Sequence, residues 1–326
     1  MGLIPEKYRD HLTKTIVLAF PVCVSNFGHM AVSIADTAFV GRIGKVEQAA
    51  ILLANTPYIL ALVFGIGVAY GITPLVGEAA VKKDHLLNAK ILRNGIIQNL
   101  MLGIMLFILL YLAAPLLSLL EQPEQVVQKA IPFLGVLMLS LVPLSVFSAC
   151  KQFAEGLSDT KMAMVITVAS NLLNIALNYI FIFGKLGVPE MGMMGSAWAT
   201  FVARIVMAVW MLGYVYYHGN YRKYWEYKEE VLMSAVLSAK IFKLGIGTGL
   251  QWLFEVGAFS FAAVMVGWIG VNAMASHQIA LSWAALSYMI ASGLSAAASV
   301  RVANEVGKGN REELRNAAFI AWYIGL

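Results

Sequence analysis

Long apolar runs alternate with short polar segments along the whole chain. Eight of these runs can cross a membrane, since a bilayer core of ~30 Å takes roughly 20 helical residues. They cover residues 15–40, 49–76, 96–117, 131–149, 162–183, 195–217, 241–266 and 274–300. A ninth run begins near Leu314 and reaches Leu326. The pattern predicts an all-α polytopic membrane protein with eight complete transmembrane helices and the start of a ninth.

A segment near the start of the chain reappears 226 positions later. Val40–Ala50 reads VGRIGKVEQAA and Val266–Ser276 reads VGWIGVNAMAS, and the register continues without a gap to Asp84 over Asn310. Ten of the 45 aligned pairs are identical, and the glycines and the hydropathy match throughout. Duplicated membrane halves usually hold a substrate site between them and work as alternating-access carriers.

The longest polar stretch, residues 218–240, separates the first six runs from the rest. We interpret residues 1–217 as a six-helix N-terminal lobe, 218–240 as a cytoplasmic linker, and 241–326 as part of a second lobe. The same period would carry a second six-helix unit to about residue 440. We therefore expect a tandem six-helix repeat whose second repeat is incomplete in this chain.

Composition and charge agree with a membrane protein. The chain is 60% hydrophobic and 13% charged, with a mean hydropathy of +0.75, whereas soluble domains carry about 25% charged residues. Eighteen Lys and Arg residues lie in the N-terminus and the even-numbered loops and four in the odd-numbered loops. Because cytoplasmic loops are enriched in Lys and Arg, this bias predicts a cytoplasmic N-terminus. The net charge of +5 then reflects topology and gives no reason to expect nucleic-acid binding.

Enzyme and metal signatures are missing from the sequence. It contains no GxSxG, HExxH, P-loop or CxxC motif, and its two cysteines, Cys23 and Cys150, have no pairing or metal-ligand spacing. We therefore expect a protein that is not an enzyme.

Four ionisable residues fall inside predicted helices: His29, Asp36, Arg204 and Glu255. Such groups are costly at membrane depth and are candidates for function. A desolvated carboxylate such as Asp36 can hold a proton or a sodium ion and release it when the site opens. Glu255 would attract a cationic substrate or a coupling ion if it faces a cavity, and Arg204 could pair with it across the lobes.

The fifth predicted helix carries Asn171, Asn174 and Asn178 on one face, because they are three and four residues apart. The helical rise of 1.5 Å per residue puts Asn178 and Thr200 near the level of Asp36. One carboxylate, two amides and a hydroxyl could form an oxygen cage for Na⁺ or a hydrated proton. We predict an ion site at Asp36, Asn174, Asn178 and Thr200. The alternative is that the asparagines only join helices through hydrogen bonds.

Further polar residues could line a substrate cavity. They are His29, Asn171, Arg204 and Gln278. The alternatives are a packed or hydrogen-bonded His29 and an Arg204 that anchors to backbone carbonyls. Glu78, Glu155 and Asp159 stand at predicted cytoplasmic helix ends, where we interpret them as solvated or capping.

Four segments carry a family resemblance. They are VGRIG (40–44), FAEGLSDT (153–160), LNYIFIFG (177–184) and SHQIA (276–280). Together they resemble the multidrug and toxic compound extrusion (MATE) family, especially its NorM-like branch. The resemblance covers nearly the whole chain and implies a twelve-helix antiporter of two six-helix lobes, which exports cationic, amphipathic compounds as sodium ions or protons enter.

The resemblance also implies roles for individual residues. Asp36 matches an aspartate of the N-terminal ion site, and Asn174, Asn178 and Thr200 match positions around it. Glu255 matches a glutamate associated with cation coupling, whose partner carboxylate in a tenth helix would lie beyond the end of this chain. We expect Na⁺ or H⁺ as coupling ion, no other cofactor, no obligate protein partner, and a location in a bacterial inner membrane.

Two other interpretations stay open. The first is a lipid-linked saccharide flippase of related architecture, which would need several cations in its cavity for a pyrophosphate. Arg204 is the only basic residue that we expect to be buried within a span, which argues against this interpretation. The second is a truncated membrane remnant that does not transport.

Overall fold

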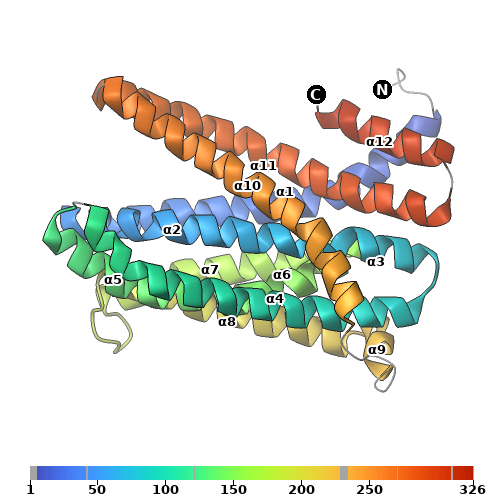
Figure 1. Cartoon of the computed structure of the whole chain (residues 1–326), viewed down its shortest axis with the longest axis horizontal. Coiled ribbons are helices and arrows are strands. Elements are labelled where there is room, and N and C mark those ends of the chain that lie inside the picture. The colour runs from blue at the N-terminus through green and yellow to red at the C-terminus, as the bar shows by residue number, and fades with distance from the viewer. Residues whose placement is uncertain are drawn as a thin grey trace.

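The computed structural model describes residues 6–41, 43–120, 122–227, 234–269, 271–309 and 311–325. Within these ranges the chain forms helices and the turns between them, and no strand (Figure 1). The helices are α1 (Glu6–Val40), α2 (Lys45–Ala69), α3 (Ile72–Val81), α4 (His85–Ala113), α5 (Glu124–Leu139), α6 (Leu141–Gly156), α7 (Lys161–Phe183), α8 (Met193–Tyr217), α9 (Gly219–Glu226), α10 (Ala235–Ile269), α11 (Val271–Lys308) and α12 (Arg311–Gly325), with a 3₁₀ helix at Ala114–Leu120.

The prediction of an all-helical membrane protein is confirmed. Seven helical spans in the described residues are long and apolar enough to cross a membrane, and α10 contains the predicted run 241–266. Two predicted runs are each divided into two helices, α2–α3 and α5–α6. The first division falls at Tyr70–Gly71, where a side chain on Gly71 would lie 2.7 Å from the backbone nitrogen of Gly245 in α10. Gly71 therefore permits a close approach of two backbones.

The first lobe is a bundle of α1 to α8 with two clusters of buried apolar side chains. One cluster fills the end near α3 and α9 and includes Phe153 and Met211. The other fills the opposite end, near the α1–α2 and α4–α5 connections, and includes Phe133 and Leu134. Helix α9 is held to the bundle because Tyr221 donates to Asp159 at 2.6 Å. This fixes the start of the segment that leads to α10.

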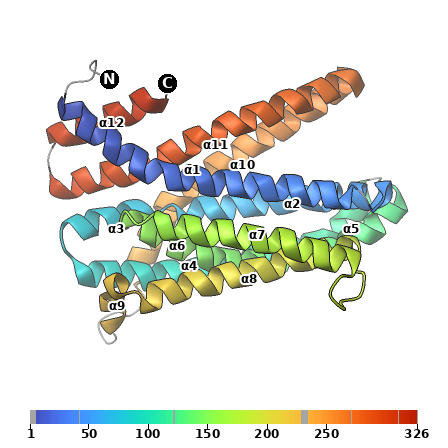
Figure 2. The ribbon, with the colours of Figure 1, turned by 180° about the vertical axis from the view of Figure 1, so that it is seen from behind.

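Helices α10 and α11 lie against the first lobe at one end and stand away from it at the other. Both views show the connected ends of α10 and α11 well separated from the α1–α2 turn (Figures 1 and 2). At the opposite end, α12 lies beside the beginning of α1 (Figure 2). There His11 of α1 bonds Glu313 of α12 at 2.6 Å and also contacts Arg301 of α11. The second lobe therefore diverges from the first toward the end that carries the α1–α2 turn.

A seam of small residues joins the two lobes where they touch. A side chain on Gly67 of α2 would lie 2.5 Å from the Cα atom of Gly249 in α10. On the other pair of helices, a side chain on Gly293 of α11 would lie 3.0 Å from the backbone nitrogen of Cys23 in α1. Small residues at such crossings let membrane helices approach closely. We call these four residues, together with Gly71 and Gly245, the glycine seam.

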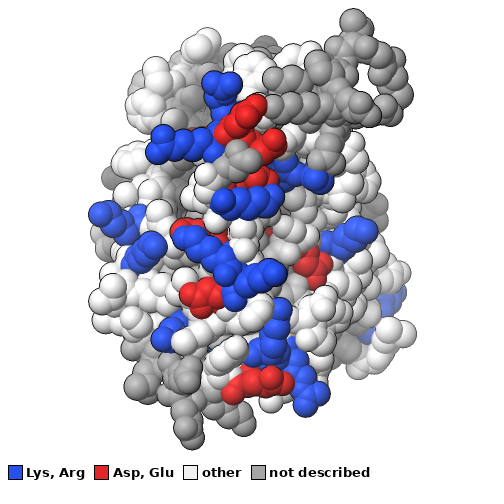
Figure 3. All heavy atoms as spheres, turned by 90° about the vertical axis from the view of Figure 1, so that its right-hand side faces the viewer, with Lys and Arg blue, Asp and Glu red and all other residues white. Residues whose placement is uncertain are grey.

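Lys and Arg side chains gather on the face at the joined end of the molecule (Figure 3). This face carries the α3–α4 turn, α9 and the α11–α12 turn (Figure 1). The basic face agrees with the bias of Lys and Arg toward the even-numbered loops, from which we predict the cytoplasmic side. The cytoplasmic position of the N-terminus stays a prediction.

Candidate functional site

Two helices of the first lobe bring three of the predicted site residues together. Asn178 of α7 donates to the side-chain oxygen of Asn174 at 3.0 Å, and Asn174 donates to the hydroxyl of Thr200 in α8 at 3.3 Å. Asn174 and Asn178 are 4% and 0% exposed, so their faces point into the bundle and away from lipid. The three residues form one chain of amide and hydroxyl groups, which is buried at the two asparagines and half-buried at Thr200.

The backbone register places Asp36 at the level of this chain. Helices α1 and α7 pack together. A side chain on Gly28 of α1 would lie 2.8 Å from the Nδ2 atom of Asn171, and the rings of Phe39 and Phe183 are 6.2 Å apart further along. Eight residues after Gly28, Asp36 is therefore level with the residue that follows Asn178. The side chain of Asp36 lies outside the described residues, as does that of Gln278.

Arg204, one turn after Thr200 on α8, points into the first lobe. Its Nη1 donates to the hydroxyl of Ser140 at 2.8 Å and also to the hydroxyl of Tyr58. The guanidinium lies 5.4 Å from the centre of the Tyr58 ring. Tyr58 and Ser140 contact each other as well, with their oxygens 3.1 Å apart. Arg204 therefore joins α8 to α2 and to the α5–α6 junction through hydrogen bonds.

Glu255 faces the second lobe's own helix α11 in this structure. Its Oε2 accepts a hydrogen bond from the hydroxyl of Tyr288 at 3.3 Å. Its position in the repeat corresponds to that of His29, since 226 residues separate them. His29 is exposed and lies within Coulombic range of Lys151 and Arg204. The two lobes thus present an acid and a base at equivalent positions.

The interpretation of Glu155 as a solvated or capping residue is wrong. Glu155 is 2% exposed and lies 3.7 Å from the ammonium of Lys151, which is itself 8% exposed. Arg204 is accordingly not the only cation held inside the first lobe. The spacing of four residues between Lys151 and Glu155, which puts them on one helix face, is the sequence signal that could have identified the pair.

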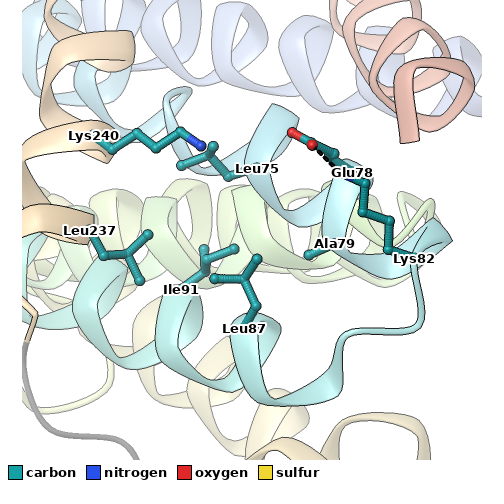
Figure 4. A pocket seen from close by; sticks show the side chains of 8 residues that line it. All are labelled: Leu75, Glu78, Ala79, Lys82, Leu87, Ile91, Leu237 and Lys240. Atoms are coloured by element: carbon teal, nitrogen blue, oxygen red, sulfur yellow. Dashed lines mark hydrogen bonds and ion pairs between the residues drawn. The ribbon is translucent and has the colours of Figure 1, made fainter. Parts of the chain in front are cut away.

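A small open pocket lies at the joined end, apart from these groups. Leu75 of α3, Ile91 of α4 and Leu237 of α10 line it, and the Glu78–Lys82 pair and Lys240 stand around it (Figure 4). Glu78 pairs with Lys82 and its side chain is 36% exposed, which agrees with its interpretation as a solvated residue. The pocket contains none of the predicted site residues.

The geometry favours binding of a small cation over bond-making chemistry. Amide and hydroxyl oxygens, with a carboxylate at the same level, are ligands that hard cations prefer. No group of three or more His, Cys, Asp or Glu suited to a transition metal occurs within the described ranges. An ion site at these residues stays a prediction.

Comparison with known proteins gives a family and a fold. The MatE family model matches residues 21–180 and 248–326. The chain is 30% identical over 325 residues to "Multidrug resistance protein MdtK" of Yersinia pseudotuberculosis, covering 98% of this chain and 70% of that protein. The protein of the same name from Proteus mirabilis is 30% identical over 324 residues, with the same coverage.

Solved structures of other proteins resemble the chain in fold. The crystal structure of a eukaryotic MATE transporter, AtDTX14, superposes with a TM-score of 0.85 at 23% identity, covering 98% of this chain and 70% of that one. A multidrug resistance MATE family transporter described in an outward-facing conformation gives a TM-score of 0.84 at 22% identity, covering 96% and 70%. These likenesses concern the fold.

Proposed function

The chain belongs to the MatE family of membrane transporters, and we propose that it exports cationic, amphipathic drugs and toxic compounds in exchange for Na⁺ or H⁺. It is an integral membrane protein whose relatives are transporters and not enzymes. We place it in a bacterial inner membrane with its N-terminus in the cytoplasm, in accord with the distribution of basic residues.

The buried chain from Asn178 through Asn174 to Thr200 is the observation that carries this proposal. It offers polar oxygens at membrane depth, where an unused polar group is costly. A carboxylate at Asp36 would complete the ligand set for a cation that carries little hydration. Ion binding there would favour one arrangement of α1 against α7, and the substrate would favour the other.

The contact between the lobes supports alternating access. The glycine seam closes the joined end of the molecule, while α10 and α11 diverge from the first lobe toward the other end (Figure 1). In the proposed cycle, this arrangement is open to the outside. Separation of the seam, with approach of the far ends, would give the inward-open arrangement.

Aromatic and acidic groups around Glu255 suit a cationic substrate. The ring of Trp252 on α10 stacks edge-on against Tyr70 at 5.1 Å, and Tyr288 bonds Glu255. Aromatic faces attract organic cations, by about 0.5–2 kcal/mol for each ring. We propose that Glu255 and these rings receive the substrate between the lobes.

Reconstitution tests the proposal directly. Vesicles containing the 326-residue chain are loaded with ethidium, and an inward gradient of Na⁺ or of H⁺ is imposed. Export that depends on one gradient supports the proposal and identifies the ion. Gradient-independent movement of a fluorescent lipid-linked saccharide would favour the flippase, to which the buried Lys151 and the half-buried Arg204 give some support. No movement of either compound would favour the remnant.

A further inference from the structure

Helix α6 holds a buried ion pair that the proposed transport cycle does not use. Lys151 and Glu155 are one turn apart, and their side chains are 10% and 3% exposed. Burying two charges is expensive, and such pairs are retained where they serve a function or specify a structure. Most of α6 around them is apolar and buried, with Phe153, Ala154 and Cys150 fully inside the core.

The pair is incompletely satisfied for so buried a position. The closest approach of the two charged groups is 3.7 Å, longer than a hydrogen bond. Within the described part of the chain, neither oxygen of Glu155 accepts a hydrogen bond and the ammonium of Lys151 donates none. Buried carboxylates normally have hydrogen-bond partners on their oxygens. The carboxylate of Glu155 can therefore accommodate a second positive ligand.

A route leads from this carboxylate to the interface between the lobes. Tyr70, at the α2–α3 junction, lies within Coulombic range of the Glu155 carboxylate and of the Tyr288 side chain. Gln152, which lies between Lys151 and Glu155 on α6, accepts a hydrogen bond at its Oε1 atom from Thr73 of α3 at 2.6 Å. On its other side, Tyr70 contacts Trp252 of the second lobe. Tyr70 therefore lies between Glu155 and the second lobe, beside Gly71 of the glycine seam.

We propose that Glu155 is a second monovalent-cation site of the first lobe, separate from the Asn174–Asn178–Thr200 chain, and that it takes up H⁺ or Na⁺ when the seam opens. The incoming cation competes with Lys151 for the carboxylate. In this proposal the cation enters when the lobes separate at the contact between Trp252 and Tyr70. The inference concerns ion binding, and it holds or fails independently of drug transport.

Lys151 is the charged group that lies beside the carboxylate of Glu155. His29 of α1 lies within range of Lys151, and Tyr288 of α11 acts on Tyr70. Several of the charged groups on the helices packed against α6 have contacts elsewhere. Glu78 of α3 pairs with Lys82, Arg93 of α4 with Trp225, His85 of α4 with Tyr224, and Arg204 of α8 with Tyr58 and Ser140.

Infrared difference spectroscopy on the chain in lipid vesicles tests the proposal. Changing the pH should convert a carboxylic acid C=O band into carboxylate bands, and the variant Glu155→Gln should lose one such band. Adding Na⁺ at fixed pH should abolish the same band if sodium competes for the site, and should leave it unchanged if the site takes only protons. The matched control is Glu78→Gln, which alters an exposed pair of the same spacing and should leave the band in place.

Lys151→Met provides a second test that keeps the carboxylate, in case Glu155→Gln does not fold. Removing the cation should move the pH at which the band changes by at least about one unit toward higher pH, whereas Lys82→Met should not move it. Identical difference spectra for the wild type and Glu155→Gln would overturn the proposal. A Lys151→Met spectrum that changes at the wild-type pH would do the same.

Discussion

Gly67 of α2 packs against Gly249 of α10, and this contact is repeated on the other side of the lobe interface by Gly293 and Cys23. Gly293 lies 226 residues after Gly67, and Gly249 lies 226 residues after Cys23. The same spacing relates Gly77 to Ala303, which also meet across the interface, with a side chain on Gly77 reaching 3.0 Å from the Cβ atom of Ala303. The sequence repeat is therefore also a pseudo-twofold relation in the contacts between the lobes.

The glycine seam should tolerate no side chain larger than hydrogen at Gly245. Gly245→Val would place atoms against the backbone of Val68, and overpacking of this kind costs about 1–3 kcal/mol. Disulfide formation between cysteines at positions 26 and 292, whose native side chains bond at 3.4 Å, reports whether the seam is closed. In a background without Cys23 and Cys150, we expect this crosslinking to fall roughly tenfold, the ratio that 1.4 kcal/mol gives.

Gly247→Val is the matched control for the seam. A side chain on Gly247 meets nothing within 4 Å, although Gly247 lies between Gly245 and Gly249 on the same helix. Crosslinking should stay at the level of the starting protein. An equal loss in both variants would mean that valine disturbs α10 in general and that the seam does not close this end.

Asn174→Ala should destabilise the first lobe and remove the effect of the coupling ion. The substitution removes the oxygen that accepts a hydrogen bond from the amide of Asn178, at a cost of about 0.5–1.5 kcal/mol. A bound ion stabilises the folded state by mass action, so the melting temperature of the wild type should rise with Na⁺ or with acid. Thermal unfolding in detergent should detect no such rise in Asn174→Ala. Thr56→Val, which removes a bond only to Leu52 of its own helix, should keep it.

A lysine at position 204 should not stabilise the protein as Arg204 does. A guanidinium can stack on Tyr58 while it donates to Ser140, whereas a lysine ammonium is a compact charge without that planar geometry. We expect a lower melting temperature, by an amount similar to that of Arg204→Met. A lysine variant as stable as the wild type would show that only the charge matters at this position.

The attachment of α9 should loosen only in strongly alkaline solution. Burial and the hydrogen bond to Asp159 raise the pKa of Tyr221 above its usual value, which is about 10. Because the folded state keeps this proton longer than the unfolded state, the contribution to stability is complete below about pH 10 and is lost as the pH rises through the folded-state value. The fluorescence of Trp225 should change as α9 loosens at high pH. The variant Tyr221→Phe has no hydroxyl to titrate at this position, so the alkaline change that Tyr221 causes should be absent.

Much of the fold could be predicted from the sequence because the length of each apolar run determines whether it forms a spanning helix. Runs of about 20 apolar residues can only be spanning helices in a bilayer, and each predicted run falls on one described helix or on two consecutive ones. The division of run 49–76 at Tyr70 could not be predicted. It depends on the approach of Gly71 to Gly245, a contact between residues far apart in the sequence.

The part of the candidate site that lies on one helix could be predicted, because the spacing of residues along a helix determines which of them share a face. Asn174 and Asn178 share a face because they are four residues apart, and the structure joins them. Partners from other helices could not be predicted, as the suggested pairing of Arg204 with Glu255 shows. In the structure Arg204 donates hydrogen bonds to Tyr58 and Ser140. Glu255 accepts one from Tyr288. The burial of Glu155 was missed because its position at a helix end indicated solvent.

Gradient-driven ethidium export by Asp36→Asn tests the central claim most directly. The matched control is Asp84→Asn, the same chemical change at the exposed N-cap of α4, where asparagine caps as well as aspartate. With both variants present in vesicles at the wild-type level, the account predicts that Asp36→Asn loses all export driven by Na⁺ or H⁺ while Asp84→Asn keeps it. Export by Asp36→Asn at the wild-type rate would contradict the account.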